Sequence, residues 1–386
     1  DKRKTMSKYG NSDRDDPVPE ERGSRFRLPV IAWLSVLFFA ACTKMSPEDG
    51  VARHDGTLVR LTVSLPQPAL PTKGARAGSL SGDAENRIED VMILVLEQEN
   101  GKYVYRYMTE GERLESTGSG TQFQAKLLST SKPVKLMLAG NYGDAFAAYA
   151  PSPSHSEAEV KAGIGCSFTG AAQSLPMYGE IAVPSGLEAD RENRFSVKML
   201  RAVARIDVEK DLTADSRPLR IESVRLYRPN DKIQLAPDES FAPESPQVTA
   251  PSVFAGAVKS QSPVVTETSE PDPVSIAGIY VPEADGVADA AARLTEAPCI
   301  VVGGYYDGQS QPTYYRVDFD PGLEGHPFGQ ILRNYKYVFR IRKVTGPGWS
   351  DPGLAAVNKA TSIVAEIEPW EDFTTEMHFE GDNYIG

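Results

Sequence analysis

Apolar and polar residues alternate along much of the chain, and this pattern predicts strands. Successive side chains of a strand point to opposite faces, so period-two alternation is typical of a strand with one buried face. The alternating or apolar segments of this kind are 59–65, 134–139, 204–208, 224–226 and 335–341. Residues 91–96 form a continuous apolar run, which predicts a strand covered on both faces. Only residues 154–162 and 284–294 have the character of short helices. We therefore predict an all-β protein made of two antiparallel β-sandwiches.

The first part of the chain has the features of a bacterial lipoprotein signal. Two arginines precede an apolar run, residues 28–41, which ends in small residues before Cys42. The run is too short for a comfortable transmembrane helix and fits the core of a signal peptide. We predict a signal region over residues 1–41, with 1–24 upstream of the true start, and Cys42 as the acylated first residue of an exported protein. The alternative is a short buried helix that contains a core cysteine.

Length and charge narrow the class of protein. The part after the signal is long for one core, so we expect a lipidated linker over residues 42–55 and two domains, 56–210 and 211–386. The formal net charge of -12 argues against nucleic acid as a partner, because phosphates need a basic face. Residues 231–273 are rich in Pro, Ser and Glu and are predicted to be an extended surface excursion of the second domain. A flexible loop and a binding loop both fit that composition.

The residues that usually carry catalysis or hold metals form no motif in this sequence. None of the four histidines, His54, His155, His326 and His378, lies near a cysteine or a second histidine at ligand spacing. Nucleophile-elbow, phosphate-loop and calcium-loop sequences are absent as well. We therefore predict that the protein is not an enzyme and uses no metal and no cofactor.

Two cysteines follow Cys42 in the chain, Cys166 and Cys299. A disulfide is permitted outside the cytosol. The two residues lie far apart in the sequence, however, and are assigned to different predicted domains. We expect two unpaired, buried thiols.

Several short segments occur in an order that resembles one family of surface proteins. An alternating strand, Gly56–Leu65, follows the lipid signal, and a basic residue then lies between small ones in Gly74–Gly78. The other segments are Glu89–Leu96, Leu136–Asn141, Leu175–Gly179, Leu200–Val208, Ile279–Glu283, Arg333–Tyr337, Val344–Gly348 and Glu368–Trp370. In these features the chain resembles the FimA-like fimbrillin family, the type V pilins, over residues 42–386. The alternative is a related surface lipoprotein of similar build that does not polymerise.

The resemblance implies two transthyretin-like β-sandwich domains and assembly by strand exchange. In the family, a trypsin-like, Arg-specific protease cuts at the position that matches the Arg76–Ala77 bond, which small residues flank here. The cut would release residues 42–76 with their strand and expose an unpaired sheet edge above an apolar groove. The displaced strand would carry Val59, Leu61, Val63 and Leu65.

A replacement strand is expected near the C-terminal end of the sequence. Residues 373–379 alternate, so that Phe373, Thr375, Met377 and Phe379 occur at every second position. The tail of a neighbouring subunit could then fill the groove by β-augmentation, in which main-chain bonds give affinity and alternate side chains fill pockets. The alternative is that this tail is an ordinary edge strand of its own domain.

These expectations combine into a structural, non-enzymatic role. We predict a shaft or accessory, tip-associated subunit of a bacterial surface fimbria, which reaches the outer membrane as a lipoprotein and contributes to adhesion. Its expected partners are other fimbrial subunits, an Arg-specific protease, outer-membrane lipid through Cys42, and a ligand on a host or bacterial surface. The alternative is a permanently lipid-anchored binding protein, or a fimbrial anchor or adhesin, that does not polymerise.

Overall fold

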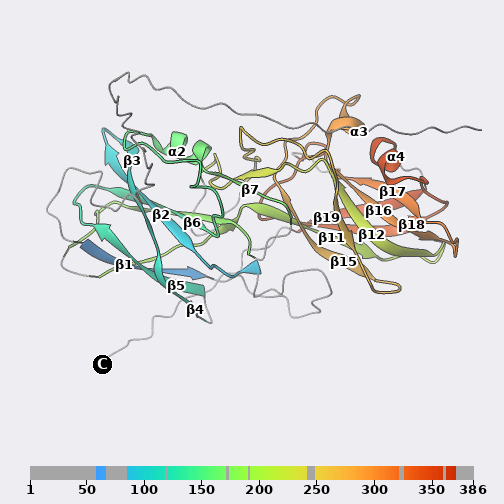
Figure 1. Ribbon diagram of the computed structural model, residues 1–386, viewed down its shortest axis with the longest axis horizontal. Coiled ribbons are helices and arrows are strands. Elements are labelled where there is room, and N and C mark those ends of the chain that lie inside the picture. Colours follow the sequence, from blue (N-terminus) through green and yellow to red (C-terminus); the bar gives the residue numbers. More distant parts are fainter. Residues whose placement is uncertain are drawn as a thin grey trace, which may run out of the picture. The chain divides into compact units, whose positions relative to one another are not determined.

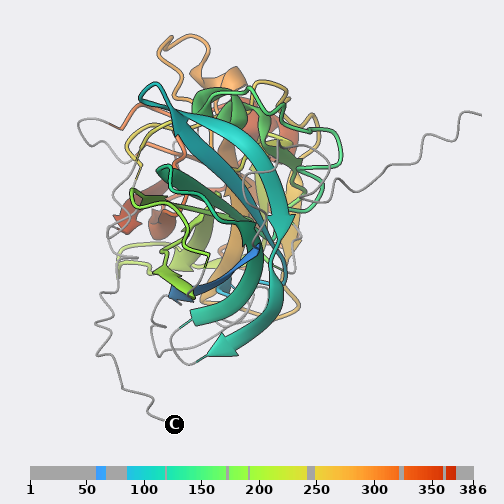
Figure 2. The same ribbon diagram turned by 90° about the vertical axis from the view of Figure 1, so that its left-hand side faces the viewer.

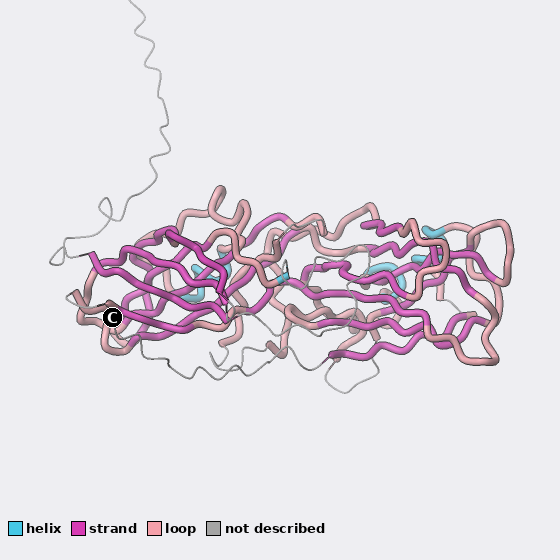
Figure 3. Tube along the Cα trace, turned by 90° about the horizontal axis from the view of Figure 1, so that it is seen from below, coloured by secondary structure: helices cyan, strands magenta, loops and turns pink. Residues whose placement is uncertain are grey.

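Strands make up most of the regular structure of this protein. The computed structural model describes residues 58–66, 85–117, 120–170, 174–189, 192–240, 248–320, 326–359 and 362–370. Within these ranges the helices are few and short, and most strands run beside one another in sheets (Figure 3). Of the predicted all-β architecture, the coarser statement is confirmed: the described chain is mostly β.

The first part of the chain forms two sheets that share one hydrophobic core (Figure 2). The first sheet has the strand order β4 (Glu112–Thr117), β5 (Gly120–Leu128), β1 (Leu58–Pro66) and β9 (Asn193–Ser196). The second has the order β10 (Leu200–Arg201), β8 (Met177–Val183), β6 (Val134–Gly140), β2 (Val91–Glu99) and β3 (Lys102–Glu110).

The sequence pattern accounts for two of these strands directly. Residues 91–97 of β2 are all buried, which confirms the prediction of a strand covered on both faces. In β5, burial alternates: Phe123 and Leu127 are buried in the first core, whereas Gln122 and Lys126 are exposed. One face of β5 therefore contributes to the core.

The second part of the chain forms two further four-stranded sheets around a second core. In this core the ring of Phe319 packs edge-on against Tyr337 and Phe339, at centroid distances of 5.5 and 5.0 Å. One sheet has the order β15 (Ser275–Pro282), β11 (Val203–Lys210), β18 (Lys336–Val344) and β19 (Ile363–Trp370). The other has the order β14 (Val264–Glu267), β12 (Leu219–Tyr227), β16 (Cys299–Tyr306) and β17 (Thr313–Asp318).

Two strand pairs are parallel, so the prediction of purely antiparallel sandwiches is wrong at these places. β1 is parallel to β9, and β11 is parallel to β18. The strands of each pair are far apart in the sequence, as parallel pairing requires, because a tight turn cannot join parallel strands. Alternation within a strand indicates which of its faces is buried. It does not indicate the direction of a partner strand that is far away in the sequence.

The first predicted helix is present and the second is mostly not. α2 (Glu157–Gly163) begins with a capping box, in which the Ser156 side chain and the Glu159 side chain each accept a backbone N–H of the other residue. The helix predicted over 284–294 is wrong except for α3 (Arg293–Glu296). The backbone of Ala284 instead exchanges hydrogen bonds with Ile331, which leaves it no part in a helix. A third helix, α4 (Pro352–Val357), lies beside β16 and β17 (Figure 1).

Part of the segment predicted as a surface excursion is buried. β13 (Lys232–Gln234) pairs with β7 (Gly165–Ser167), and Ile233, Leu235, Ala236 and Val248 belong to the first core. The guanidinium of the buried Arg333 donates to the carbonyls of Leu235 (2.7 Å) and Gln234 (2.8 Å) and pairs with Glu283 (2.6 Å). These contacts compensate for burying the backbone of a segment whose composition suggests a loop.

The change from one core to the other occurs within β11. Val203 belongs to the first core, and the next residue, Ala204, belongs to the second. The change lies a few residues before the predicted boundary after residue 210. The division into domains stays a prediction.

Both described cysteines are free and buried, as expected from the sequence. Burial raises the pKa of the Cys166 thiol to about 12. Burial also raises the pKa of Cys299, whose sulfur lies 3.1 Å from a guanidinium nitrogen of Arg228. Neither thiol is activated for chemistry.

We predict that Arg333→Ala destabilises the protein strongly. The substitution leaves the buried Glu283 carboxylate without its cationic partner, and such a loss costs about 3–5 kcal/mol in the free energy of unfolding. The measurement is urea-induced unfolding at neutral pH. The control is Arg194→Ala, because Arg194 pairs with Glu192 while its side chain is 77% exposed, and exposed pairs contribute no more than about 1 kcal/mol. Equal losses for both variants would contradict the prediction.

Candidate assembly site around β1

β1 lies inside its sheet, between β5 and β9. It is antiparallel to β5 from Leu58↔Leu128 to Pro66↔Gly120, and parallel to β9 from Leu61↔Asn193 to Ser64↔Ser196. The place that β1 occupies between these two strands is called the β1 slot below. Removal of β1 would therefore leave a slot with two unpaired sides, and not the single unpaired edge expected from the sequence.

The register identifies the residues of β5 that face the core beside the slot. Val59, Leu61, Val63 and Leu65 are the register partners of Leu127, Ala125, Phe123 and Thr121. All four of these β5 residues are buried. The four positions predicted for the displaced strand are thus in register with the buried row of β5.

β9 depends on β1 for its place in the sheet. In the described part of the chain, β1 is the only strand of this sheet that is hydrogen-bonded to β9. The chain before β9 is held by Asn193, whose side chain accepts from Glu188 N (3.0 Å) and donates to Glu188 O (2.9 Å). A strand that replaced β1 would have to pair with both β5 and β9 to restore the sheet.

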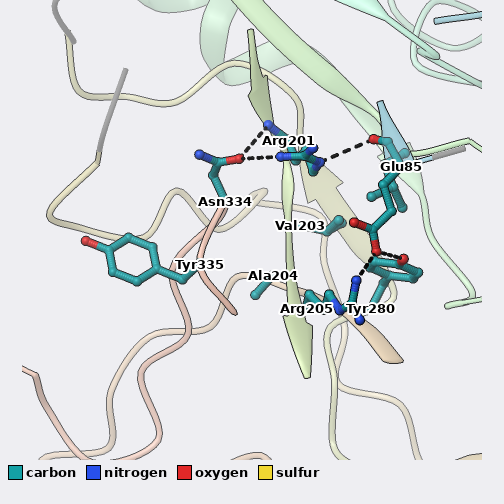
Figure 4. A pocket seen from close by; sticks show the side chains of 9 residues that line it. Glu85, Arg201, Val203, Ala204, Arg205, Tyr280, Asn334 and Tyr335 are labelled. Carbon is teal, nitrogen blue, oxygen red and sulfur yellow. Dashed lines mark hydrogen bonds and ion pairs between the residues drawn. The ribbon is translucent and has the colours of Figure 1, made fainter. Parts of the chain in front are cut away.

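The chain after β1 re-enters the described structure at Glu85, which is buried in a network of charges (Figure 4). Its carboxylate accepts from Arg205 (2.5 Å) and from the hydroxyl of Tyr280, and its carbonyl accepts from Arg201 (3.2 Å). Arg201 also donates to Asn334 (3.3 Å). The network therefore ties the start of this segment to β10, β11 and β15.

Asp207 extends the network on β11. Its carboxylate accepts from Arg205 (2.8 Å) and from the backbone N–H of Gly278 (2.8 Å), and it pairs with Lys336 (2.9 Å). Burial alone would raise the pKa of Asp207, but the hydrogen bonds and charges of Arg205 and Lys336 outweigh burial and lower it. The folded protein therefore favours the ionised carboxylate.

This arrangement is suited to holding chain segments together. The recess between Glu85, Arg201, Tyr280 and Asn334 has room for about one water molecule. Across the described ranges, no three or more His, Cys, Asp and Glu side chains gather in a way that could hold a metal ion. None of the helices found there is long and apolar enough to cross a bilayer.

All the other residues predicted to act in assembly lie outside the described residues. These are Cys42, Arg76, Ala77, Phe373, Thr375, Met377 and Phe379. β19 ends at Trp370, directly before the predicted donor segment, and it is the edge strand beside β18. The roles of these residues stay predictions.

Sequence reasoning missed β9, Thr121 and the network around Glu85. The alternation in residues 204–208 places Arg205 and Asp207 on one face, which suggests a solvent-facing side. The structure buries Asp207 to 4% exposure, because Arg205 and Lys336 neutralise it. Opposite charges two residues apart in a strand were the available signal, since both lie on the same face.

The comparisons with known proteins concern the fold. No protein-family model and no curated protein matches the sequence. A candidate cell adhesion protein from Parabacteroides distasonis is similar in structure with a TM-score of 0.50 and 14% identity, over 81% of this chain and 98% of that chain. A second from the same organism has a TM-score of 0.49 and 16% identity, over 83% of this chain and 99% of that one.

The tip fimbrial protein Mfa3 from Porphyromonas gingivalis is also similar, with a TM-score of 0.44 and 15% identity, over 81% of this chain and 99% of that chain. At identities this low, the similarity establishes the fold and not the activity. The fold is thus shared with a candidate bacterial cell adhesion protein, the class of surface protein that the sequence suggested.

We predict that stability falls in acid as Asp207 takes up a proton. The pKa of Asp207 is lowered in the folded state, so its contribution is complete above the unfolded carboxyl pKa of about 3.9 and is lost as the pH falls through the lower folded value. Asp207→Asn should cost about 1.5–3 kcal/mol at pH 7 and should flatten the loss of stability below pH 4. The measurement is urea unfolding from pH 3 to pH 7, with the exposed Asp289→Asn as control. An unchanged acid profile for Asp207→Asn would disprove this.

Proposed function

We propose that this chain is a structural subunit of a bacterial surface fimbria and belongs to the FimA-like fimbrillin family. In this proposal it consists of two transthyretin-like sandwiches, residues 56–210 and 211–386, and acts as a shaft or accessory, tip-associated subunit without enzymatic activity. The observation that carries the proposal is the position of β1, an interior strand whose sequence connection to the rest of the chain contains Arg76. The fold shared with a candidate cell adhesion protein supports it.

Export as a lipoprotein would bring the subunit to the cell surface. Cys42 follows a cationic flank and an apolar run, and it would carry the lipid that holds the precursor in the outer membrane. β1 begins at Leu58, so only a short stretch would separate the lipid from the slot. Until processing, the chain itself would keep the slot filled.

Cleavage after Arg76 would turn β1 into a replaceable strand. The cut would leave β1 bound by its pairing with β5 and β9 alone, with no covalent link to the remaining subunit. The chain after the cut would stay in place because Glu85 is held by Arg201, Arg205 and Tyr280. Loss of β1 would then open the slot without releasing the new N-terminal segment.

The tail of another subunit would refill the slot. The slot offers two rows of unpaired main-chain groups, which is the template that β-augmentation uses. The tail has large apolar side chains at Phe373, Met377 and Phe379, and each one that enters the slot is worth about 1.5–3 kcal/mol before ordering costs. Each subunit could then donate a tail and accept one, which permits a continuous fibre. Adhesion would follow from the surface that such a fibre presents to a host or bacterial ligand.

We predict that an Arg-specific protease converts the protein from residue 43 onward into an assembling form. Mass spectrometry should find a new N-terminus at Ala77, and size-exclusion chromatography should then show a ladder of oligomers. Arg76→Ala should prevent both changes. A protein that ends at residue 372 should be cut normally but should form no ladder, because it has no tail to donate.

Two results would oppose this proposal. Resistance of the Arg76–Ala77 bond, or cleavage that yields no oligomer, would favour the alternative of a permanently lipid-anchored surface binding protein. A ladder formed by the protein that ends at residue 372 would show that the donor strand lies elsewhere in the chain.

A further inference from the structure

The β1 slot contains a buried polar atom without a partner. Thr121 is 2% exposed, and among the described residues its hydroxyl Oγ1 makes no hydrogen bond. The other core-facing residues of β5 beside the slot, Phe123, Ala125 and Leu127, are apolar. Thr121 is therefore the one position in this row where an incoming strand can gain a polar contact.

β1 does not provide that contact. The register partner of Thr121 is Leu65, and a leucine side chain has no hydrogen-bonding group. A buried hydroxyl without a partner is unfavourable, whereas two threonines in register on the same face of neighbouring strands can hydrogen-bond, because a hydroxyl both donates and accepts. A strand with a hydroxyl at this register position would thus fit the slot better than β1 at this point.

We propose that Thr121 sets the register of strand exchange by pairing with Thr375 of a second copy of this chain. This inference rests on the proposed function. In the alternating series Phe373, Thr375, Met377 and Phe379, Thr375 is the only residue with a hydroxyl. Thr374 lies next to it but belongs to the opposite face of a strand, because side chains alternate.

The register also determines the direction of the incoming strand. If the tail ran in the direction of β1, the pairing of Thr375 with Thr121 would place Glu371 opposite the buried Ala125, and an unpaired buried carboxylate is strongly unfavourable. In the opposite direction, Phe379 comes opposite Ala125 and Met377 opposite Phe123, whereas Phe373 falls just before Gly120, the first residue of β5. The large side chain of Phe379 then lies beside the small one of Ala125, as close packing requires. The tail therefore runs parallel to β5 and antiparallel to β9.

This pairing makes the exchange favour the tail over β1 at one defined position. β1 leaves the hydroxyl of Thr121 unpaired, and the tail satisfies it. A buried hydrogen bond of this kind is worth roughly tenfold in an equilibrium constant. Thr121 is thus a specificity-determining residue that discriminates between two apolar strands.

The first arm of the experiment uses the intact protein and tests the slot while β1 still occupies it. Thr and Val have nearly the same shape, so comparing Leu65→Thr with Leu65→Val isolates the hydroxyl. We expect Leu65→Thr to be the more stable of the two in urea unfolding, and the order to reverse when each is combined with Thr121→Val. The control is Leu61→Thr against Leu61→Val, where Val should be preferred because Leu61 faces Ala125. A preference for Val at position 65 in both backgrounds would overturn the role of Thr121.

The second arm measures capture of a synthetic peptide, residues 371–386, by protein that has been cut after Arg76. The Thr375→Val peptide should bind about tenfold more weakly, and Thr374→Val should change binding less than about twofold. With Thr121→Val protein, the difference between the wild-type and Thr375→Val peptides should disappear. If neither the Thr121 nor the Thr375 substitution changes binding of the peptide, this inference is overturned and the proposed function is not. If the wild-type peptide does not bind at all, the proposed strand donation is overturned, and this pairing with it.

Disulfide trapping tests the direction in which the incoming tail runs. A Phe379→Cys peptide should cross-link to Ala125→Cys protein and not to Thr121→Cys protein. The alternative arrangement, with the tail in the direction of β1 and Phe379 opposite Thr121, predicts the reverse pattern. That pattern would overturn the proposed register.

Discussion

The pairing of β1 on both of its sides is the interaction on which the first sheet depends. β1 is the link between β5 and β9. A sheet that loses an interior strand loses two rows of main-chain hydrogen bonds together with the cover of its core. The first core therefore needs an occupant in this slot at all times. Main-chain pairing and alternate apolar side chains are what any occupant must supply, and contacts at single positions can then decide between competing strands.

Buried charges hold two segments in place in addition to the sheets. Glu85 is fixed by Arg201, Arg205 and Tyr280, and Arg333 fixes the segment around Gln234. Such pairs are poor sources of net stability, since desolvation of the charges offsets much of their attraction. Their effect here is to fix the position of each segment. A charged side chain that lost its partner while buried would lower the stability strongly, so each segment is restricted to one place. The two networks keep the start of the segment at Glu85 and the short strand that contains Gln234 in place beside the cores.

Local features were predictable from the sequence, and distant pairings were not. The apolar run of β2 and the alternation of β1 and β11 specify strands, because a strand repeats every two residues. The partnership of β1 with β9 and the burial of residues 233–236 depend on contacts between segments far apart in the chain. A polar residue such as Asp207 is expected to face solvent until its partners are known. The slot could be predicted because the strand that fills it was expected from the sequence. The position of Thr121 beside the slot could be found only from the register of the strands.

The physical meaning of the slot depends on how its occupant is attached. While β1 is part of the chain, its dissociation is reversed by an intramolecular step, and a short linker keeps its effective concentration near the millimolar range. Pairing that is weak at one position, such as Leu65 against Thr121, then has little consequence. Under the proposed cleavage, β1 would lose this advantage and compete on contacts alone. A single unsatisfied hydroxyl, unimportant in the intact chain, would then be enough to favour another strand.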